Sequence, residues 1–87
     1  MVSENDRLLG RQIAAGRVLA GLSQSVLAAR AKISVPTLRR MEAAEGATSG
    51  YINNVNAVRR ALEAEGIEFS NGGKPGVRLK FKRAPEG

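Results

Sequence analysis

The 87-residue sequence contains no cysteine, no histidine and no tryptophan, and its aromatic residues are one tyrosine and two phenylalanines. Without cysteine and histidine, the chain has no disulfides, thiol nucleophiles, histidine-based triads or Cys/His zinc sites. The acidic residues are scattered singly, without the spacing of a calcium loop. No apolar run is long enough to span a membrane, and "MVSENDRLLG" lacks the apolar core of a signal peptide. We therefore expect a soluble cytoplasmic protein with no metal, no cofactor and no membrane contact.

Positive charge is in excess, with a formal net charge of +6. Residues 1–33 carry five basic and two acidic groups, residues 34–66 carry four of each, and residues 67–87 carry five and two. A small basic protein attracts polyanions, nucleic acid first and an acidic membrane surface second. An enzyme is not expected, because the glutamates that would have to serve as general acids or bases have no recognisable catalytic groups around them.

Apolar spacing and capping residues predict a mainly α fold of four helices followed by a β-hairpin. The predicted helices cover about 6–20, 23–31, 34–42 and 51–65. The predicted N-caps are Asn5 or Asp6, Ser23, Ser34, and Thr48 or Ser49. Gly21 and Gly66 are predicted to end the first and last of these helices, because glycine adopts the left-handed conformation without strain.

After Gly66 the periodicity changes to two, which predicts strands at 67–70 and 77–82 joined by a glycine-rich turn. Along the second strand, apolar and basic residues alternate, so one face is apolar and the other is predicted to be uniformly basic. Residues 84–87 are predicted to be disordered. Two interpretations of the hairpin remain open: its apolar face packs on the last helix of the same chain, or its edge pairs with a second copy. In the second case the interface residues are Val77, Leu79 and Phe81.

The stretch "LSQSVLAARAKISVPTLRRME" (22–42) predicts two short helices joined by a connection of about three residues. This is the spacing of a helix-turn-helix that reads DNA, although a packing corner of two helices has a similar pattern. Leu38 and Met41 are predicted to anchor the second helix from beneath. The residues left for its outer side are Val35, Pro36, Thr37, Arg39 and Arg40.

The same stretch resembles the phage-repressor-like (Cro-type, xenobiotic-response-element) helix-turn-helix regulators. The resemblance rests on "GLSQ" (21–24), "LA" (27–28), "IS" (33–34) and "TLRRME" (37–42), with Arg17 seven residues before Gln24. It covers roughly residues 6–66. It implies a lambda-repressor-like DNA-binding domain of four or five helices over residues 1–66, and most members of the family bind operator DNA as dimers. Residues 67–83 would then be an extension for packing or dimerisation.

The resemblance also implies residue roles. Gln24 would hydrogen-bond a DNA phosphate at the start of its helix, and Arg40 would bond bidentately to guanine. Arg17 and Glu42 would form a partly buried ion pair. The DNA-contacting residues implied are Ser23, Gln24, Lys32, Ser34, Val35, Pro36, Thr37, Arg39, Arg40, Asn53 and Asn54.

Lys32 departs from the family pattern, because it stands where family members usually have glycine with positive φ. Either the turn differs locally, or the backbone strain is tolerated and Lys32 contacts a phosphate.

From these features we expect a sequence-specific regulator of transcription, a repressor that binds the major groove of an inverted-repeat operator as a homodimer. The alternative is the DNA-binding antitoxin of a toxin–antitoxin pair, whose hairpin contacts the toxin. A third interpretation is a nucleic-acid binder held by charge alone. The expected location is the nucleoid in a bacterial cytoplasm, with the protein encoded by the bacterium or a phage.

Overall fold

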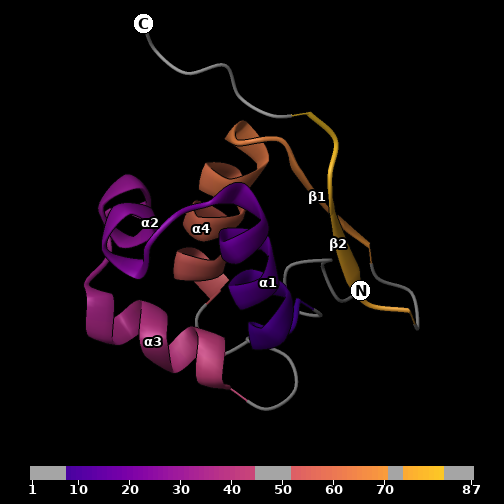
Figure 1. The fold of residues 1–87 in the computed structure, drawn as a ribbon. Coiled ribbons are helices and arrows are strands. Elements are labelled where there is room, and N and C mark those ends of the chain that lie inside the picture. Colours follow the sequence, from indigo (N-terminus) through magenta and orange to yellow (C-terminus); the bar gives the residue numbers. More distant parts are fainter. Residues whose placement is uncertain (1–7, 45–51, 71–73, 82–87) are drawn as a thin grey trace, which may run out of the picture.

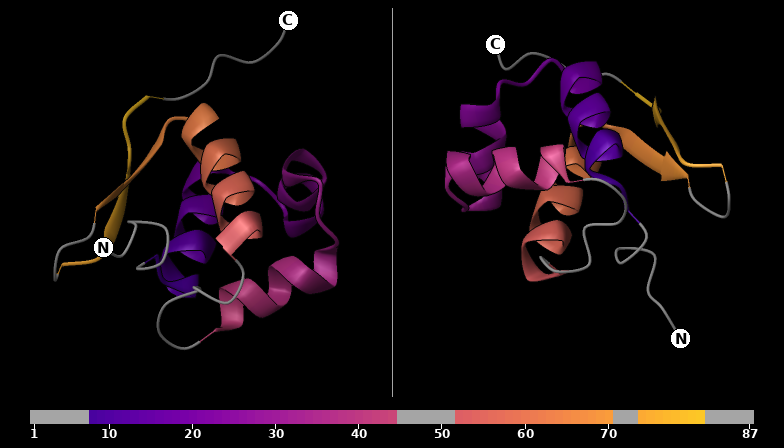
Figure 2. Two further views of the ribbon diagram at one scale, coloured as in Figure 1. Left: turned by 180° about the vertical axis from the view of Figure 1, so that it is seen from behind. Right: turned by 90° about the horizontal axis from the view of Figure 1, so that it is seen from below.

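The computed structural model describes residues 8–44, 52–70 and 74–81. It shows a mainly helical chain with a small antiparallel sheet of two strands (Figure 1). The elements are α1 (Gly10–Ala20), α2 (Gln24–Ala31), α3 (Val35–Ala43), α4 (Ile52–Ala64), β1 (Ile67–Ser70) and β2 (Gly76–Leu79). None of the helices in these ranges combines the length and the apolar character needed to cross a membrane. The hairpin lies on one side of α1 and α4, and α2 and α3 lie on their other side (Figure 2).

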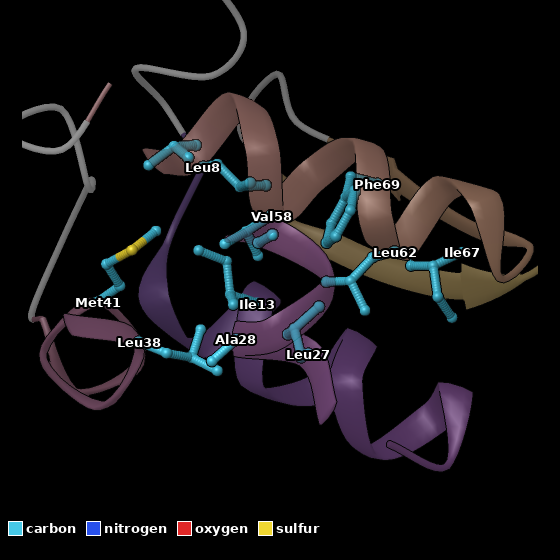
Figure 3. Packing of buried hydrophobic residues seen from close by; sticks show 12 residues of the cluster. Leu8, Ile13, Leu27, Ala28, Leu38, Met41, Val58, Leu62, Ile67 and Phe69 are labelled. Atoms are coloured by element: carbon cyan, nitrogen blue, oxygen red, sulfur yellow. The ribbon is translucent and has the colours of Figure 1, made fainter. Parts of the chain in front are cut away.

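The helices and β1 share one core, in which most of the side chains are aliphatic (Figure 3). Burial of one such side chain stabilises the fold by about 1.5–3 kcal/mol relative to exposure. The buried hydrophobic residues are Leu8, Ile13, Leu27, Ala28, Ala31, Leu38, Met41, Val55, Val58, Leu62, Ile67 and Phe69. Leu38 and Met41, the predicted anchors of α3, are both among them.

The ends of the helices follow the local signals in four places. Ser23 Oγ accepts a hydrogen bond from the Val26 amide at 3.1 Å, and Ser34 Oγ accepts one from the Thr37 amide at 3.2 Å. Gly21 has φ 77°, and Gly66 has φ 92°. These predicted N-caps and left-handed C-terminal glycines are therefore confirmed.

The start of α1 was predicted wrongly. The helix begins at Gly10 rather than Asp6, so neither Asn5 nor Asp6 caps it. Leu9 is the N-cap, and its amide donates to Gln12 Oε1 at 2.9 Å. The side chain of Gln12 thus accepts from a backbone amide at the start of the helix, which is the role expected of the predicted N-cap. The predicted caps of α4, Thr48 and Ser49, lie outside the described residues.

The hairpin packs within the same chain, with β2 against α1 and β1 against both α1 and α4. Its register pairs Ile67 with Leu79 and Phe69 with Val77, so these four side chains share one face. β2 ends at Leu79, three residues earlier than predicted.

The basic face predicted for the second strand is partly neutralised by the first strand. Glu68 of β1 lies directly opposite Arg78 and forms an ion pair with it. Lys80 Nζ lies 3.9 Å from the same carboxylate. Lys82 and residues 83–87 lie outside the described residues.

Candidate nucleic-acid interface

The connection between α2 and α3 consists of Lys32, Ile33 and Ser34. Lys32 adopts φ 58° and ψ 43°, and it is the one non-glycine residue with positive φ in the described part of the chain. The Lys32 and Ile33 amides donate to the carbonyls of Ala29 and Ala28 at 3.2 and 3.0 Å. The left-handed turn is therefore present, and the chain tolerates a strain of about 1–2 kcal/mol at Lys32.

The α3 helix has a buried side and an exposed side. Leu38 and Met41 are fully buried, whereas Pro36, Arg39 and Arg40 are exposed. The predicted anchors and these three outward positions are confirmed. The exposed side of α3 therefore carries two guanidinium groups, those of Arg39 and Arg40.

Two residues at the start of α3 are less exposed than predicted. Val35 is half-buried and packs against the core, so its placement on the outer side is correct only in part. Thr37 is half-buried, and its Oγ1 accepts a hydrogen bond from Ser34 Oγ at 2.8 Å. The hydroxyls of Ser34 and Thr37 are thus hydrogen-bonded to each other, which orients both at the N-terminus of α3.

Arg17 and Glu42 form the predicted ion pair between α1 and the end of α3. Arg17 Nε donates to Glu42 Oε2 at 2.8 Å, and Nη2 donates to Oε1 at 3.2 Å. A third guanidinium nitrogen, Nη1, donates to the Leu22 carbonyl at 3.0 Å. The side chains are 17% and 8% exposed, so the pair is largely shielded from water. Its role is to fix α3 against α1.

Gln24 extends this pair toward the exterior. Its Nε2 donates to Glu42 Oε1 at 3.0 Å, and its Oε1 accepts from Arg39 Nε at 3.4 Å. The amide is thereby oriented, because its nitrogen faces a carboxylate and its oxygen faces a guanidinium. The second hydrogen on Nε2 stays available to a phosphate. The sequence predicted the phosphate role of Gln24 but not this position between Glu42 and Arg39.

The remaining candidate residues differ in their freedom. Lys32 and Arg40 are exposed, and neither forms an ion pair with an acidic residue within the described ranges. Ser23 is exposed, with its hydroxyl oxygen used as a helix cap. In the first turn of α4, Asn53 is exposed and Asn54 is half-buried. Among the candidate residues, Lys32 and Arg40 therefore carry charges that are available to a polyanion.

Arg30 of α2 is less available to a polyanion, because it forms an ion pair. Its Nη1 lies 2.6 Å from Oε2 of Glu65, whose side chain is 10% exposed. The contact joins the end of α2 to the turn after α4. Arg30 thus links α2 to the turn after α4, and no local pattern in the sequence predicts this pairing.

Among residues 8–44, 52–70 and 74–81, no three acidic side chains converge in a way that would hold a metal ion. In comparisons with known proteins, no protein-family model matches this chain, and no curated protein matches it.

Proposed function

We propose that this chain is a sequence-specific regulator that binds double-stranded DNA by inserting α3 into the major groove. The carrying observation is the two-sidedness of α3: Leu38 and Met41 are fully buried, while Arg39 and Arg40 are exposed on a helix held by an ion pair. A helix fixed in this way pays little entropy when it docks. The four-helix arrangement is compatible with the lambda-repressor-like fold that the sequence resembles.

The proposed contacts divide into base reading and phosphate binding. Arg40 reads a guanine, because its guanidinium can bond bidentately to O6 and N7, and such a pair contributes about 1–3 kcal/mol of discrimination. Lys32 and the free hydrogen of Gln24 Nε2 bind phosphates on either side of α3. Arg39 is already hydrogen-bonded to Gln24 and binds phosphate beside it.

Two copies would act together. α3 has nine residues, and so short a helix contacts few base pairs, whereas a two-fold dimer reads two half-sites of an inverted repeat. Such a dimer bound over a promoter excludes polymerase, which makes repression the proposed mode of regulation. Its site of action is the nucleoid.

The test is selection of bound fragments from a random DNA pool, followed by binding measurements on the selected site. Arg40→Ala is expected to weaken specific binding by about 10–100-fold and to relax the preference at one base position of each half-site. The matched control is Arg60→Ala, which removes the same charge from an exposed position on α4. If both variants weaken binding equally for all sequences, the protein binds by charge alone and the proposal is wrong.

A second candidate is the antitoxin of a toxin–antitoxin pair. It is favoured by apolar side chains that the hairpin leaves in solvent: Leu79 is 37% exposed and Phe81 is 53% exposed. In that case the same α3 binds the operator, and a second protein covers the end of the hairpin. Co-purification of a stoichiometric partner from the native host would favour this candidate.

A further inference from the structure

A groove runs between α1 and β2, which lie side by side (Figures 1 and 2). Its wider part has a volume of about 490 Å³ and is open to solvent. Two large apolar side chains of α1 line it in contact with water, because Val18 is 67% exposed and Leu19 is 43% exposed. The other lining residues are Ala14, Ala15 and Val77. Since the hairpin and α3 lie on different sides of α1 (Figure 2), this groove is separate from the proposed DNA-binding surface.

The outer edge of β2 beside the groove has unpaired backbone groups. The Lys80 amide donates to the Gly66 carbonyl at 2.7 Å, which makes these two residues a hydrogen-bonded pair. Because such pairs alternate along an antiparallel ladder, Arg78 is also bonded to β1, whereas the N–H and C=O groups of Val77 and Leu79 point away from β1. The described part of the chain supplies no third strand to pair with them. Such an edge is a template for one more strand.

The outward face of the hairpin carries an excess of positive charge next to this edge. The Arg78 and Lys80 side chains are 76% and 55% exposed, and both lie near the one carboxylate of Glu68. A single negative charge thus faces two positive ones. Arg11 lines the smaller part of the groove, and Lys74 is exposed two residues before β2. Within the described residues, neither of these two forms an ion pair.

We propose that this edge receives a strand from another protein, in which apolar and acidic residues alternate. Beside Val77 and Leu79, the added strand places apolar side chains, which point toward α1 and cover its exposed apolar residues. Beside Arg78 and Lys80, it places carboxylates on the outward face of the sheet. Its backbone satisfies the N–H and C=O groups of Val77 and Leu79, so the hairpin becomes a sheet of three strands.

Charge complementarity favours this occupant. Opposite charges directly across a sheet attract each other, and like charges there are destabilising. Carboxylates beside Arg78 and Lys80 supply the negative charge that Glu68 alone does not balance. Arg11 and Lys74 are available in the same way to an acidic residue at the end of the segment. A strand with the alternation of β2 itself would instead bring basic side chains next to basic ones. The net charge of +6 adds a long-range attraction for an acidic segment.

This inference does not depend on the proposed function. Occupation of the β2 edge leaves α3 uncovered, so the partner strand and DNA are expected to bind at the same time. A chain that selects no DNA sequence but binds the strand would refute the function alone. A chain that selects a DNA sequence but binds no strand would refute this inference alone.

The probe is a short fluorescent peptide in which aspartate and valine alternate, and its binding to the full chain is followed by fluorescence anisotropy. One control peptide has the same composition but places all aspartates before all valines, so its charge is equal and its alternation is lost. A second control carries lysine in place of aspartate, which reproduces the alternation of β2. The alternating acidic peptide is expected to bind at least ~10-fold more tightly than either control.

Hydrogen exchange of individual amides locates the added strand. The Val77 and Leu79 amides are expected to exchange more slowly when the acidic peptide is bound, because they gain a hydrogen-bond partner. The Arg78 amide is already bonded to β1 and is expected to change less. Protection confined to α3 would mean that the peptide binds there as a polyanion, and this result would overturn the proposal.

Two matched pairs of variants test the side chains. Val18→Glu places a carboxylate in the groove and is expected to weaken binding of the acidic peptide by ~10-fold or more. Val26→Glu adds the same charge at an exposed valine of α2 and should bind as the wild type does. Lys80→Gln removes a cation beside the added carboxylates and should weaken binding by about 2–5-fold. Lys32→Gln removes an exposed cation before α3 and should have no effect. Circular dichroism checks that all four variants fold.

Three results would each overturn the proposal: equal binding of the acidic peptide and either control peptide, unchanged exchange of the Val77 and Leu79 amides, and equal effects of the two variants in either pair. A stable dimer that pairs through this edge and excludes the acidic peptide would do the same, since the occupant would then be a second copy of the chain.

Discussion

Replacing Arg17 by alanine removes the cation that joins α1 to the end of α3. The variant loses two contacts to Glu42 and one to the Leu22 carbonyl. Among the described residues, the Glu42 carboxylate then keeps only the amide of Gln24 as a hydrogen-bond partner. Since the Glu42 side chain is 8% exposed, water can replace few of the lost contacts. Breaking a buried ion pair by removing one partner costs about 3–5 kcal/mol.

The lower end of that range applies here, because the Arg17 side chain is 17% exposed. A loss of about 3 kcal/mol lowers the melting temperature of a domain of this size by about 12–24 °C. It also removes a large fraction of the roughly 4–13 kcal/mol of total stability expected for 87 residues.

The assay is thermal and urea unfolding followed by circular dichroism, with Arg40→Ala as the control. Arg40 is exposed and forms no described ion pair, so its replacement should change the free energy of unfolding by less than about 0.5 kcal/mol. The double variant Arg17→Met, Glu42→Leu removes both charges and is expected to be more stable than Arg17→Ala. If Arg17→Ala unfolds within about 1 kcal/mol of the wild type, the ion pair does not hold α3 and the reasoning fails.

Four further variants test other parts of the structure. Lys32→Gly should raise the free energy of unfolding by about 0.5–1 kcal/mol in urea titrations because it relieves the strain at φ 58°, and it should lower the salt slope of DNA binding by about one phosphate contact. Gln12→Ala should cost about 2–3 kcal/mol, because its buried amide bonds the N-cap of α1 and both hairpin strands, and hydrogen exchange should accelerate in the hairpin. Gly10→Ala should cost more than about 2 kcal/mol, since its Cβ would lie 2.2 Å from the Met41 carbonyl oxygen. Gly16→Ala, whose nearest contact is a side-chain atom at 3.3 Å, should cost less, as measured in the same titration.

The elements that the sequence predicted well are those defined by short-range contacts. Ser23 and Ser34 cap their helices through amides three residues ahead, and Gly21 ends α1 through its own backbone angle. Such signals are complete within a few residues of sequence. The four helices and the hairpin followed from them and from the spacing of apolar residues.

The errors arise where distant residues decide the local structure. The start of α1 depends on Gln12, whose Nε2 donates to the Ser70 and Gly76 carbonyls at 2.9 and 3.1 Å. Those carbonyls are 58 and 64 residues away in sequence, and no local pattern announces the contact. By local sequence alone, Asp6 is the better N-cap for α1. The start of the helix is instead decided by the tertiary hydrogen bonds of Gln12.

The net charge of the hairpin's outer face likewise depends on residues that are distant in sequence. Alternation along 77–82 gave the correct faces of β2, but the charge of a face also depends on the neighbouring strand. The register places Glu68 opposite Arg78. A single strand therefore predicts which way a side chain points, and only the pairing shows what it meets.

The interior ion pair and the exterior of α3 form one connected set of hydrogen bonds. Glu42 accepts a hydrogen bond from Gln24, and Gln24 accepts one from Arg39. The last bond is the longest, at 3.4 Å between Arg39 Nε and Gln24 Oε1, so Arg39 is oriented but easily released to a phosphate. Loss of Arg17 or Glu42 would therefore lower the stability of the fold and change the orientation of the Arg39 side chain. In the proposed complex, such variants would bind DNA with altered affinity because α3 is displaced, although neither Arg17 nor Glu42 is among the proposed DNA contacts.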